Sequence, residues 1–491
     1  MTTHAPGPGE RRRATARGAV INSVFLVALG GLNMLKAVVA AAFLTQSEFG
    51  VWSILFLAIA LVIAIKSVAV GDKYIQQDEP DQTLAFQKAF TLELITAALM
   101  MGLAFLLAPL VVVIYGESEL LVPTMALSLI LPGLALQAPI WVYYRRMDFL
   151  RQRLLLAVDP LVSFTLTVGL AAAGVGYWSL IAGAVAGAVA GGIVAVLASP
   201  IRLALHYDHG TMKRYLSFSW PLVVAVGSGL AIAQLSIIFG ERELGLAGAG
   251  AIGLAAIITQ WTDRADAVIT QAMYPAICRV AEQRDLLFEA FAKSNRLALM
   301  WGVPFGVGLS LFAGDLIDHV LGSGWDDTLV LLQVFGLIAA VNHIGFNWSA
   351  FFRARGETRP IAIVNVLALT AFVVAALPLL VSNGLGGFAA GMAIMTAVSL
   401  TARFYYLGRL FPNIEIARHV FRAIAPTLPA AGAVLALRLA LDAERTLEVA
   451  LAEIAVYVLV TVVATLVFER RLLREVVSYL RPAPQLETGI P

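Results

Sequence analysis

Charged side chains inside long apolar stretches are the most informative chemical groups in this sequence of 491 residues. Lys36 and Arg264 fall well inside two such stretches, and Lys66 lies closer to the end of a third. A charged side chain costs roughly 2.5–3.5 kcal/mol at the centre of a bilayer, so it normally faces a partner or a cavity. Ammonium and guanidinium groups in a cavity would bind an anionic headgroup such as a diphosphate, which offers several acceptor oxygens.

Two carboxylates, Asp263 and Asp266, flank Arg264 in the same stretch. Either one would neutralise the arginine in a structural pair, and an ion-coupling role is the alternative. His343 lies in a later apolar stretch and is the third candidate for ion coupling, because imidazole changes its charge near neutral pH. A buried, hydrogen-bonded histidine is the structural interpretation of the same residue.

Neutral amides accompany these charges. Asn33 shares a helical face with Lys36, and Gln260 belongs to the same stretch as Arg264. With Asn342, they are candidates for hydrogen bonds to sugar hydroxyls, although amides also serve ordinary helix packing. The histidines lack zinc-ligand spacing, and the sequence shows no phosphate-binding loop or nucleophile motif. We therefore expect no metal, no cofactor and no enzymatic activity.

The elements that must position these residues are membrane-spanning helices. The composition is 60% apolar and 13% charged, far from the balance of a soluble protein. About fourteen apolar runs of roughly 20 residues follow one another, each long enough to cross a bilayer as a helix. We therefore predict an all-α, multi-pass membrane protein. Pro132 and Pro139 predict kinks in the fourth span, and Gly183, Gly187 and Gly191 predict a close-packing face on the sixth.

The basic residues are distributed unevenly between alternate polar segments. Most of the 34 basic residues occur in every second segment, starting with the N-terminal one. The intervening segments hold only Arg242, Arg438 and Arg445. An excess of Lys and Arg is typical of cytoplasmic loops. We therefore predict that both termini are cytoplasmic.

The two halves of the chain contain similar segments in the same order. "TQSEFGVWS" at 45–53 corresponds to "GERELGLAG" at 240–248, and "GVGYW" at 174–178 corresponds to "GLGGF" at 384–388. Six spans per repeat place the repeat axis along the membrane normal, with a central cavity between two lobes. The predicted organisation is a mobile cytoplasmic N-terminus at 1–16, an N-lobe at 17–206, a C-lobe at 207–412, two extra helices at 413–468, and a cytoplasmic amphipathic helix with a tail at 469–491.

The sequence resembles a known family in four stretches: "LTQSEFGVWSILFLAIAL" at 44–61, "RRMDF" at 145–149, "GVGYWSLIAGAVAGAV" at 174–189 and, more weakly, "RARGETR" at 353–359. It is similar to the polysaccharide transporters, the lipid-linked oligosaccharide flippases of the multidrug/oligosaccharidyl-lipid/polysaccharide exporter superfamily. The resemblance implies an inner-membrane protein whose lobes alternate between inward-open and outward-open shapes. An undecaprenyl-diphosphate headgroup and its sugars would cross through the central cavity.

Related flippases of peptidoglycan precursors carry basic groups on helices 1, 2 and 8, where this chain has Lys36, Lys66 and Arg264. The resemblance thus implies a substrate-binding role for these three residues. Two of the three are lysine rather than arginine, and Asp263 and Asp266 flank the third. Internal pairing of these charges therefore remains the alternative.

The leading functional prediction is a transporter of lipid-linked oligosaccharides for exopolysaccharide, capsule or lipopolysaccharide synthesis. A drug or cation antiporter on the same fold is the second hypothesis, and a membrane polysaccharide polymerase or ligase is the third. An antiporter would favour a net acidic cavity, whereas polymerases and ligases generally need a large external loop. The expected partners are the lipid-linked substrate, membrane lipids, and a polymerase with its chain-length machinery, but no nucleic acid.

Overall fold

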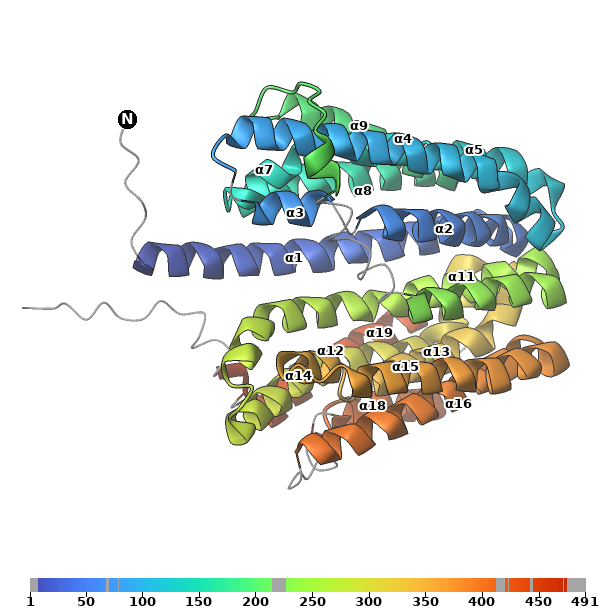
Figure 1. Cartoon of the computed structure of the whole chain (residues 1–491). Coiled ribbons are helices and arrows are strands. Elements are labelled where there is room, and N and C mark those ends of the chain that lie inside the picture. The colour runs from blue at the N-terminus through green and yellow to red at the C-terminus, as the bar shows by residue number, and fades with distance from the viewer. Residues whose placement is uncertain are drawn as a thin grey trace, which may run out of the picture. The chain divides into compact units, whose positions relative to one another are not determined.

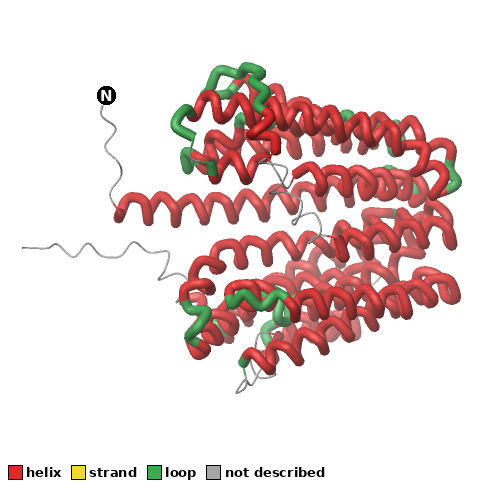
Figure 2. Tube along the Cα trace, in the orientation of Figure 1, coloured by secondary structure: helices red, strands yellow, loops and turns green. Residues whose placement is uncertain are grey.

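The computed structural model describes residues 8–67, 70–77, 79–213, 227–411, 420–422, 424–441, 445–470 and 472–474. Within these ranges the chain is helical, with short connections and without strands (Figures 1 and 2). The all-α prediction is therefore confirmed. The predicted C-terminal amphipathic helix falls largely outside the described residues.

The helices of the N-terminal part are α1 (Pro8–Ala41), α2 (Gln46–Ser67), α3 (Val70–Gln76), α4 (Gln82–Tyr115), η1 (Ser118–Leu120), α5 (Leu121–Ser128), α6 (Ile130–Leu136), α7 (Ile140–Arg145), α8 (Phe149–Ala172) and α9 (Trp178–Leu197). Those that follow are α11 (Gly227–Arg279), α12 (Arg284–Leu316), η2 (Ile317–Leu321), η3 (Ser323–Thr328), α13 (Leu329–Asn342), α14 (Trp348–Ala354), α15 (Arg359–Ala371), η4 (Phe372–Ala376), α16 (Leu377–Leu410), α18 (Thr427–Leu441) and α19 (Leu447–Phe468).

Eleven helical segments of the described chain are long and apolar enough to cross a membrane, and Thr427–Ala440 is a shorter apolar helix. Two of the eleven are interrupted by glycines with non-helical dihedrals, Gly245 (φ 70°, ψ −171°) and Gly384 (φ 61°, ψ −147°). Residues with a Cβ atom rarely adopt these backbone dihedral angles, so glycine permits a sharp turn between two helices at each position. The chain is thus a multi-pass membrane protein, and the number fourteen stays a prediction.

The chain forms two compact units. The first unit comprises residues 1–268, 320–331 and 363–399, and the second comprises 269–319, 332–362 and 400–491. The predicted division into an N-lobe and a C-lobe stays a prediction. In the first unit α8 packs along α9 (Figure 1) and along α1, and α6 packs against α9. Helix α1 begins at Pro8, a position that favours proline, so residues 8–16 of the segment expected to be mobile are helical.

The predicted packing face on the sixth span is confirmed. A methyl group on Gly183 would lie 2.0 Å from Oγ1 of Thr167, and one on Gly187 would lie 2.6 Å from the carbonyl oxygen of Asp159. These distances are far below van der Waals contact, so only glycine allows α9 to approach α8 this closely.

The predicted kinks of the fourth span are confirmed as breaks. Helix α6 ends at Leu136, residues 137–139 form a turn, and α7 begins at Ile140, directly after Pro139. Proline has no backbone N–H to donate and disfavours helical dihedrals in the residue before it. The break therefore places Gln137 at an interrupted helix, where its side chain can turn toward neighbouring helices.

In the second unit, α18 and α19 pack against each other and against α12. Their interface contains the apolar cluster of Phe312, Ala430, Val434 and Tyr457. The hydroxyl of Tyr457 donates a 2.8 Å hydrogen bond to the carbonyl oxygen of Pro304. The extra helical pair is therefore joined to α12 by a packed core and not only by the connecting chain.

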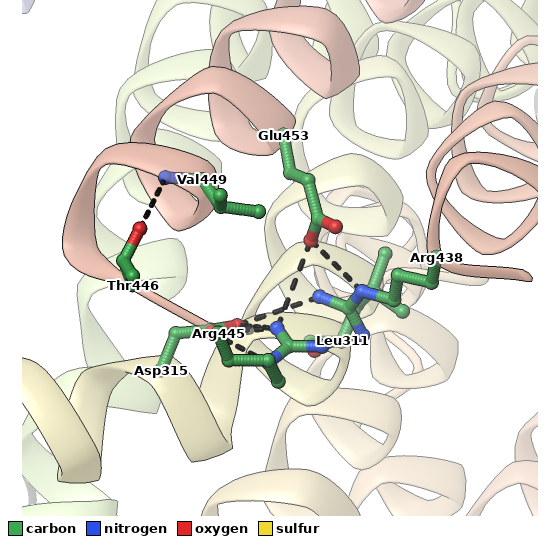
Figure 3. A network of polar contacts seen from close by, with 7 residues as sticks. All are labelled: Leu311, Asp315, Arg438, Arg445, Thr446, Val449 and Glu453. Carbon is green, nitrogen blue, oxygen red and sulfur yellow. Dashed lines mark hydrogen bonds and ion pairs between the residues drawn. The ribbon is translucent and has the colours of Figure 1, made fainter. Parts of the chain in front are cut away.

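Four charged side chains close one end of this interface, and we call them the α12 charge cluster: Asp315, Arg438, Arg445 and Glu453 (Figure 3). Nε of Arg438 lies 2.8 Å from Glu453, and Nε of Arg445 lies 3.1 Å from Asp315. Two of the three basic residues on the predicted external side are thus neutralised by carboxylates. Toward the predicted cytoplasmic side, Arg296 of α12 pairs with Glu469, the residue that follows α19.

Candidate functional site

A cavity of about 220 Å³ lies within the first unit, between residues of α1, α2, α9 and α11. Three predicted site residues line it together: Lys36, Asn33 and Gln260. The aromatic rings of Trp52, Phe56 and Trp261 form part of the same wall. The cavity therefore combines one ammonium group and two amides with broad apolar faces.

Lys36 is held at the cavity wall by a second helix. Its Nζ donates a 2.9 Å hydrogen bond to Oγ of Ser163 in α8. Asp159, one turn before Ser163, is the carboxylate whose charge acts on Lys36. Oδ2 of Asp159 accepts a 3.1 Å hydrogen bond from Nε2 of Gln137. We call Gln137, Asp159 and Ser163 the polar seat of Lys36.

The polar seat depends on the glycines of α9. A methyl group on Gly187 would lie 2.7 Å from Oδ1 of Asp159 and 2.9 Å from Cβ of Ser163. One on Gly191 would lie 2.9 Å from Nε2 of Gln137. Because Gly187 and Gly191 have no side chains, α9 leaves room for the polar seat between apolar helices.

The polar seat was largely missed by reasoning from the sequence, although a signal was present. Asp159, Ser163 and Thr167 follow one another at four-residue spacing, which matches the spacing of the glycines on α9. Residues four apart share one face of a helix. A polar stripe and a glycine stripe on consecutive spans predict that the two stripes face each other.

The aromatic wall of the cavity is formed by two helices. The rings of Trp52 and Phe56, one turn apart on α2, have centroids 5.5 Å apart. A methyl group on Gly31 of α1 would lie 3.4 Å from Nε1 of Trp261, so α1 and α11 are in contact here. Asn33 is exposed and donates to the carbonyl oxygen of Leu29 at 3.2 Å. Aromatic faces beside amides are suited to sugar rings, which present C–H groups and hydroxyls.

Two predicted site residues, Asn342 and His343, lie in the second unit at the end of α13. Nδ1 of His343 donates to the carbonyl oxygen of Ala339 at 2.5 Å, and the buried ring lies where a methyl group on Gly302 would be. The carbonyl oxygen of His343 accepts a 2.8 Å hydrogen bond from Asn295. His343 is thus a buried, hydrogen-bonded histidine, as the structural interpretation expects. Its ion-coupling role stays a prediction.

The remaining predicted residues have positions in the fold but fewer described contacts. The side chains of Lys66 and Arg264 lie outside the described part of the structure. Asp263 and Asp266 lie on α11, within two turns of Gln260; Asp263 is exposed and Asp266 is half-buried. The roles of these four residues in binding or ion coupling stay predictions.

Comparison with known proteins gives consistent results. The model of a family described as polysaccharide biosynthesis protein matches residues 39–330, more than half of the chain. Lipopolysaccharide biosynthesis protein WzxC of Escherichia coli (strain K12) is 21% identical over 347 residues, which cover 68% of each protein.

Solved structures show a shared fold. The lipid II flippase MurJ in an inward closed conformation superposes with a TM-score of 0.66 at 13% identity, over 93% of this chain and 100% of that one. An inward-facing multidrug resistance MATE family transporter of the MOP superfamily gives a TM-score of 0.63 at 12% identity, over 80% of this chain and 98% of that one. The predicted transporter fold is therefore confirmed.

Proposed function

The chain belongs to the polysaccharide biosynthesis protein family, and we propose that it flips a lipid-linked oligosaccharide across the membrane. The substrate would carry an undecaprenyl-diphosphate headgroup and would move from the cytoplasmic to the outer leaflet by alternating access. Its sugars would serve exopolysaccharide, capsule or lipopolysaccharide synthesis, with a polymerase and its chain-length machinery acting afterwards. The similarity to WzxC supports this proposal.

The observation that carries the proposal is the cavity of the first unit. It places the ammonium group of Lys36 next to Trp52, Phe56 and Trp261. An ammonium group binds phosphate oxygens by charge and hydrogen bonding, and this attraction is stronger where water is scarce. The aromatic faces and the amides of Asn33 and Gln260 would contact the attached sugars. The proposed substrate contains both chemical features, an anionic group and sugar rings.

Lys66 and Arg264 are proposed to complete the anion-binding surface as the substrate moves. Arg264 offers two parallel donors to a phosphate group, whereas lysine offers a compact charge. Its location on α11, one turn beyond Gln260, supports this proposal. Asp263 and Asp266 are proposed as ion-coupling groups on the same helix.

The proposal is tested by substituting Lys36 in cells that depend on this chain for polymer export. Lys36→Ala should reduce polymer output at least tenfold at normal membrane abundance, with lipid-linked intermediates accumulating in mass spectra of membrane lipids. Lys36→Arg should retain more output, because the charge is kept. Lys293→Ala is the matched control, since Lys293 pairs with Glu289 one turn away at 2.6 Å. Normal output from Lys36→Ala at normal abundance would contradict the proposed role of the cavity.

A further inference from the structure

Lys36 faces two competing environments. It lines the cavity, and its Nζ is hydrogen-bonded to Ser163 in the polar seat. A single ammonium group cannot give its full charge to an anion in the cavity and to the carboxylate of Asp159 at once. Any anion that binds in the cavity therefore competes with Asp159 for Lys36.

We propose that Asp159 is a positioning residue that competes with the anionic part of the substrate for Lys36 and thereby promotes its release. This inference rests on the proposed function, because it requires an anionic substrate in the cavity. A transporter must release what it binds, and a binding charge without an internal competitor would hold a diphosphate too tightly. The fixed carboxylate lowers the affinity and returns Lys36 to its resting position after release.

The contacts around Asp159 indicate that the lysine moves while the carboxylate stays. Asp159 is bound by Gln137 at 3.1 Å and is enclosed on its other side by α9, where a methyl group on Gly187 would lie 2.7 Å from Oδ1. It therefore has little room to follow a substrate. Lys36 instead has a flexible four-carbon stem and rotatable donors. Lys36 can thus exchange Asp159 for an anion in the cavity by rotation of its own side chain at the cavity wall.

The test measures binding of farnesyl diphosphate to the full chain in nanodiscs, with uncharged farnesol as the reference ligand. Trp52 and Trp261 line the cavity, so quenching of tryptophan fluorescence reports occupancy. Asp159→Asn keeps the size of the side chain and removes its charge. Its affinity for farnesyl diphosphate should rise at least about fivefold, the lower end of typical coupling between two ligands. Its affinity for farnesol should stay unchanged.

Two further variants separate this proposal from the proposed function. Lys36→Met should weaken farnesyl diphosphate binding, and the double variant Lys36→Met with Asp159→Asn should show no gain over Lys36→Met. Thr167→Val is the matched control, because Thr167 lies two turns beyond Asp159 on the same stripe and its shape is kept. Should Asp159→Asn fail to fold, Asp159→Ser provides the test, since it also removes the carboxylate and should tighten binding.

Equal or weaker binding by folded Asp159→Asn, or a gain that persists without Lys36, would overturn the competition. Unchanged binding by Lys36→Met would instead reject the anion-binding role on which both proposals rest. Polymer output provides a second measurement, which separates the release role of Asp159 from a purely structural role. The folded Asp159→Asn variant should bind the probe more tightly and yet export less polymer, because release is slowed. Output equal to or above that of the wild type would overturn the release role.

Discussion

Gly187→Ala should disrupt the site through helix packing, without changing any polar residue. The added methyl group would lie 2.6 Å from the carbonyl oxygen of Asp159, 2.7 Å from its Oδ1 and 2.9 Å from Cβ of Ser163. Ordinary contact begins near 3.4 Å, so α8 must retreat by about 0.8 Å at this level. The neighbouring atoms include backbone, which cannot rotate away as the end of a flexible side chain can. Overpacking of this kind costs about 1–3 kcal/mol.

The displacement has a functional consequence as well as an energetic one. Ser163 accepts the hydrogen bond of Lys36 at 2.9 Å, and a shift of α8 by most of an ångström would break it. Gly187→Ala should therefore lower the melting temperature of the purified protein and also change its affinity for farnesyl diphosphate.

The matched control is Gly169→Ala on α8, where an added methyl group meets no atom within 4 Å. It should leave the melting temperature unchanged or raise it, because alanine is favoured over glycine in a helix by about 0.5–1 kcal/mol. Both variants are measured by thermal unfolding in detergent, followed by size-exclusion chromatography. Equal melting temperatures for Gly187→Ala and the wild type would refute the tight contact between α8 and α9.

Two other predictions concern sites away from the cavity. Asp315→Asn should lower the melting temperature. Breaking a buried ion pair costs roughly 3–5 kcal/mol, and the cost is smaller here because the Arg445 side chain is 43% exposed. The control Asp326→Asn, at an exposed position of η3, should leave the melting temperature unchanged. Near the end of the described range 79–213, the hydroxyl of Thr211 and, with a smaller effect, its backbone N–H donate hydrogen bonds to Asp208 and lower the pKa of its carboxyl group. This local stabilisation is complete above the unfolded pKa of about 3.9 and is lost as the pH falls through the lower folded pKa, so amide exchange at Thr211 should accelerate only in that acidic range.

The fold was largely predictable because its strongest determinants are local. Apolar runs of about 20 residues have few stable structures in a bilayer other than helices. Pro139 lacks a backbone donor, so the break before α7 follows from one residue. The glycines of α9 predicted a packing face, and the polar stripe of α8 at the same four-residue spacing was the signal for the helix that meets it. Each of these features affects the helix in which it occurs or the contact of that helix with lipid, so it can be recognised from a short stretch of sequence.

The polar seat and the α12 charge cluster were harder to predict because they depend on distant pairs. Lys36 and Ser163 are 127 residues apart, and nothing near Lys36 indicates that α8 will lie beside it. Glu453 lies 15 residues from Arg438, and Asp315 lies 123 residues from it, so the sequence did not indicate that one arginine would contact both acids. The break between α13, which ends at Asn342, and α14, which begins at Trp348, also has no local signal in the sequence. It contains no proline, and it is stabilised by side-chain hydrogen bonds such as the one from Asn295 to the carbonyl oxygen of His343.

The α12 charge cluster also has a consequence for how the protein is made. Arg438 and Glu453 belong to consecutive helices and can pair as soon as α18 and α19 leave the insertion machinery as a hairpin. Asp315 and Arg438 are 123 residues apart. At synthesis rates of about 5–20 residues per second, Arg438 is added to the chain roughly 6–25 s after Asp315, and the two cannot pair before then. During this interval the end of α12 carries an unmatched acid. A nascent chain that stops before α18 lacks both of the arginines that pair with Asp315, so α12 reaches its final charge balance only after the last two helices are made.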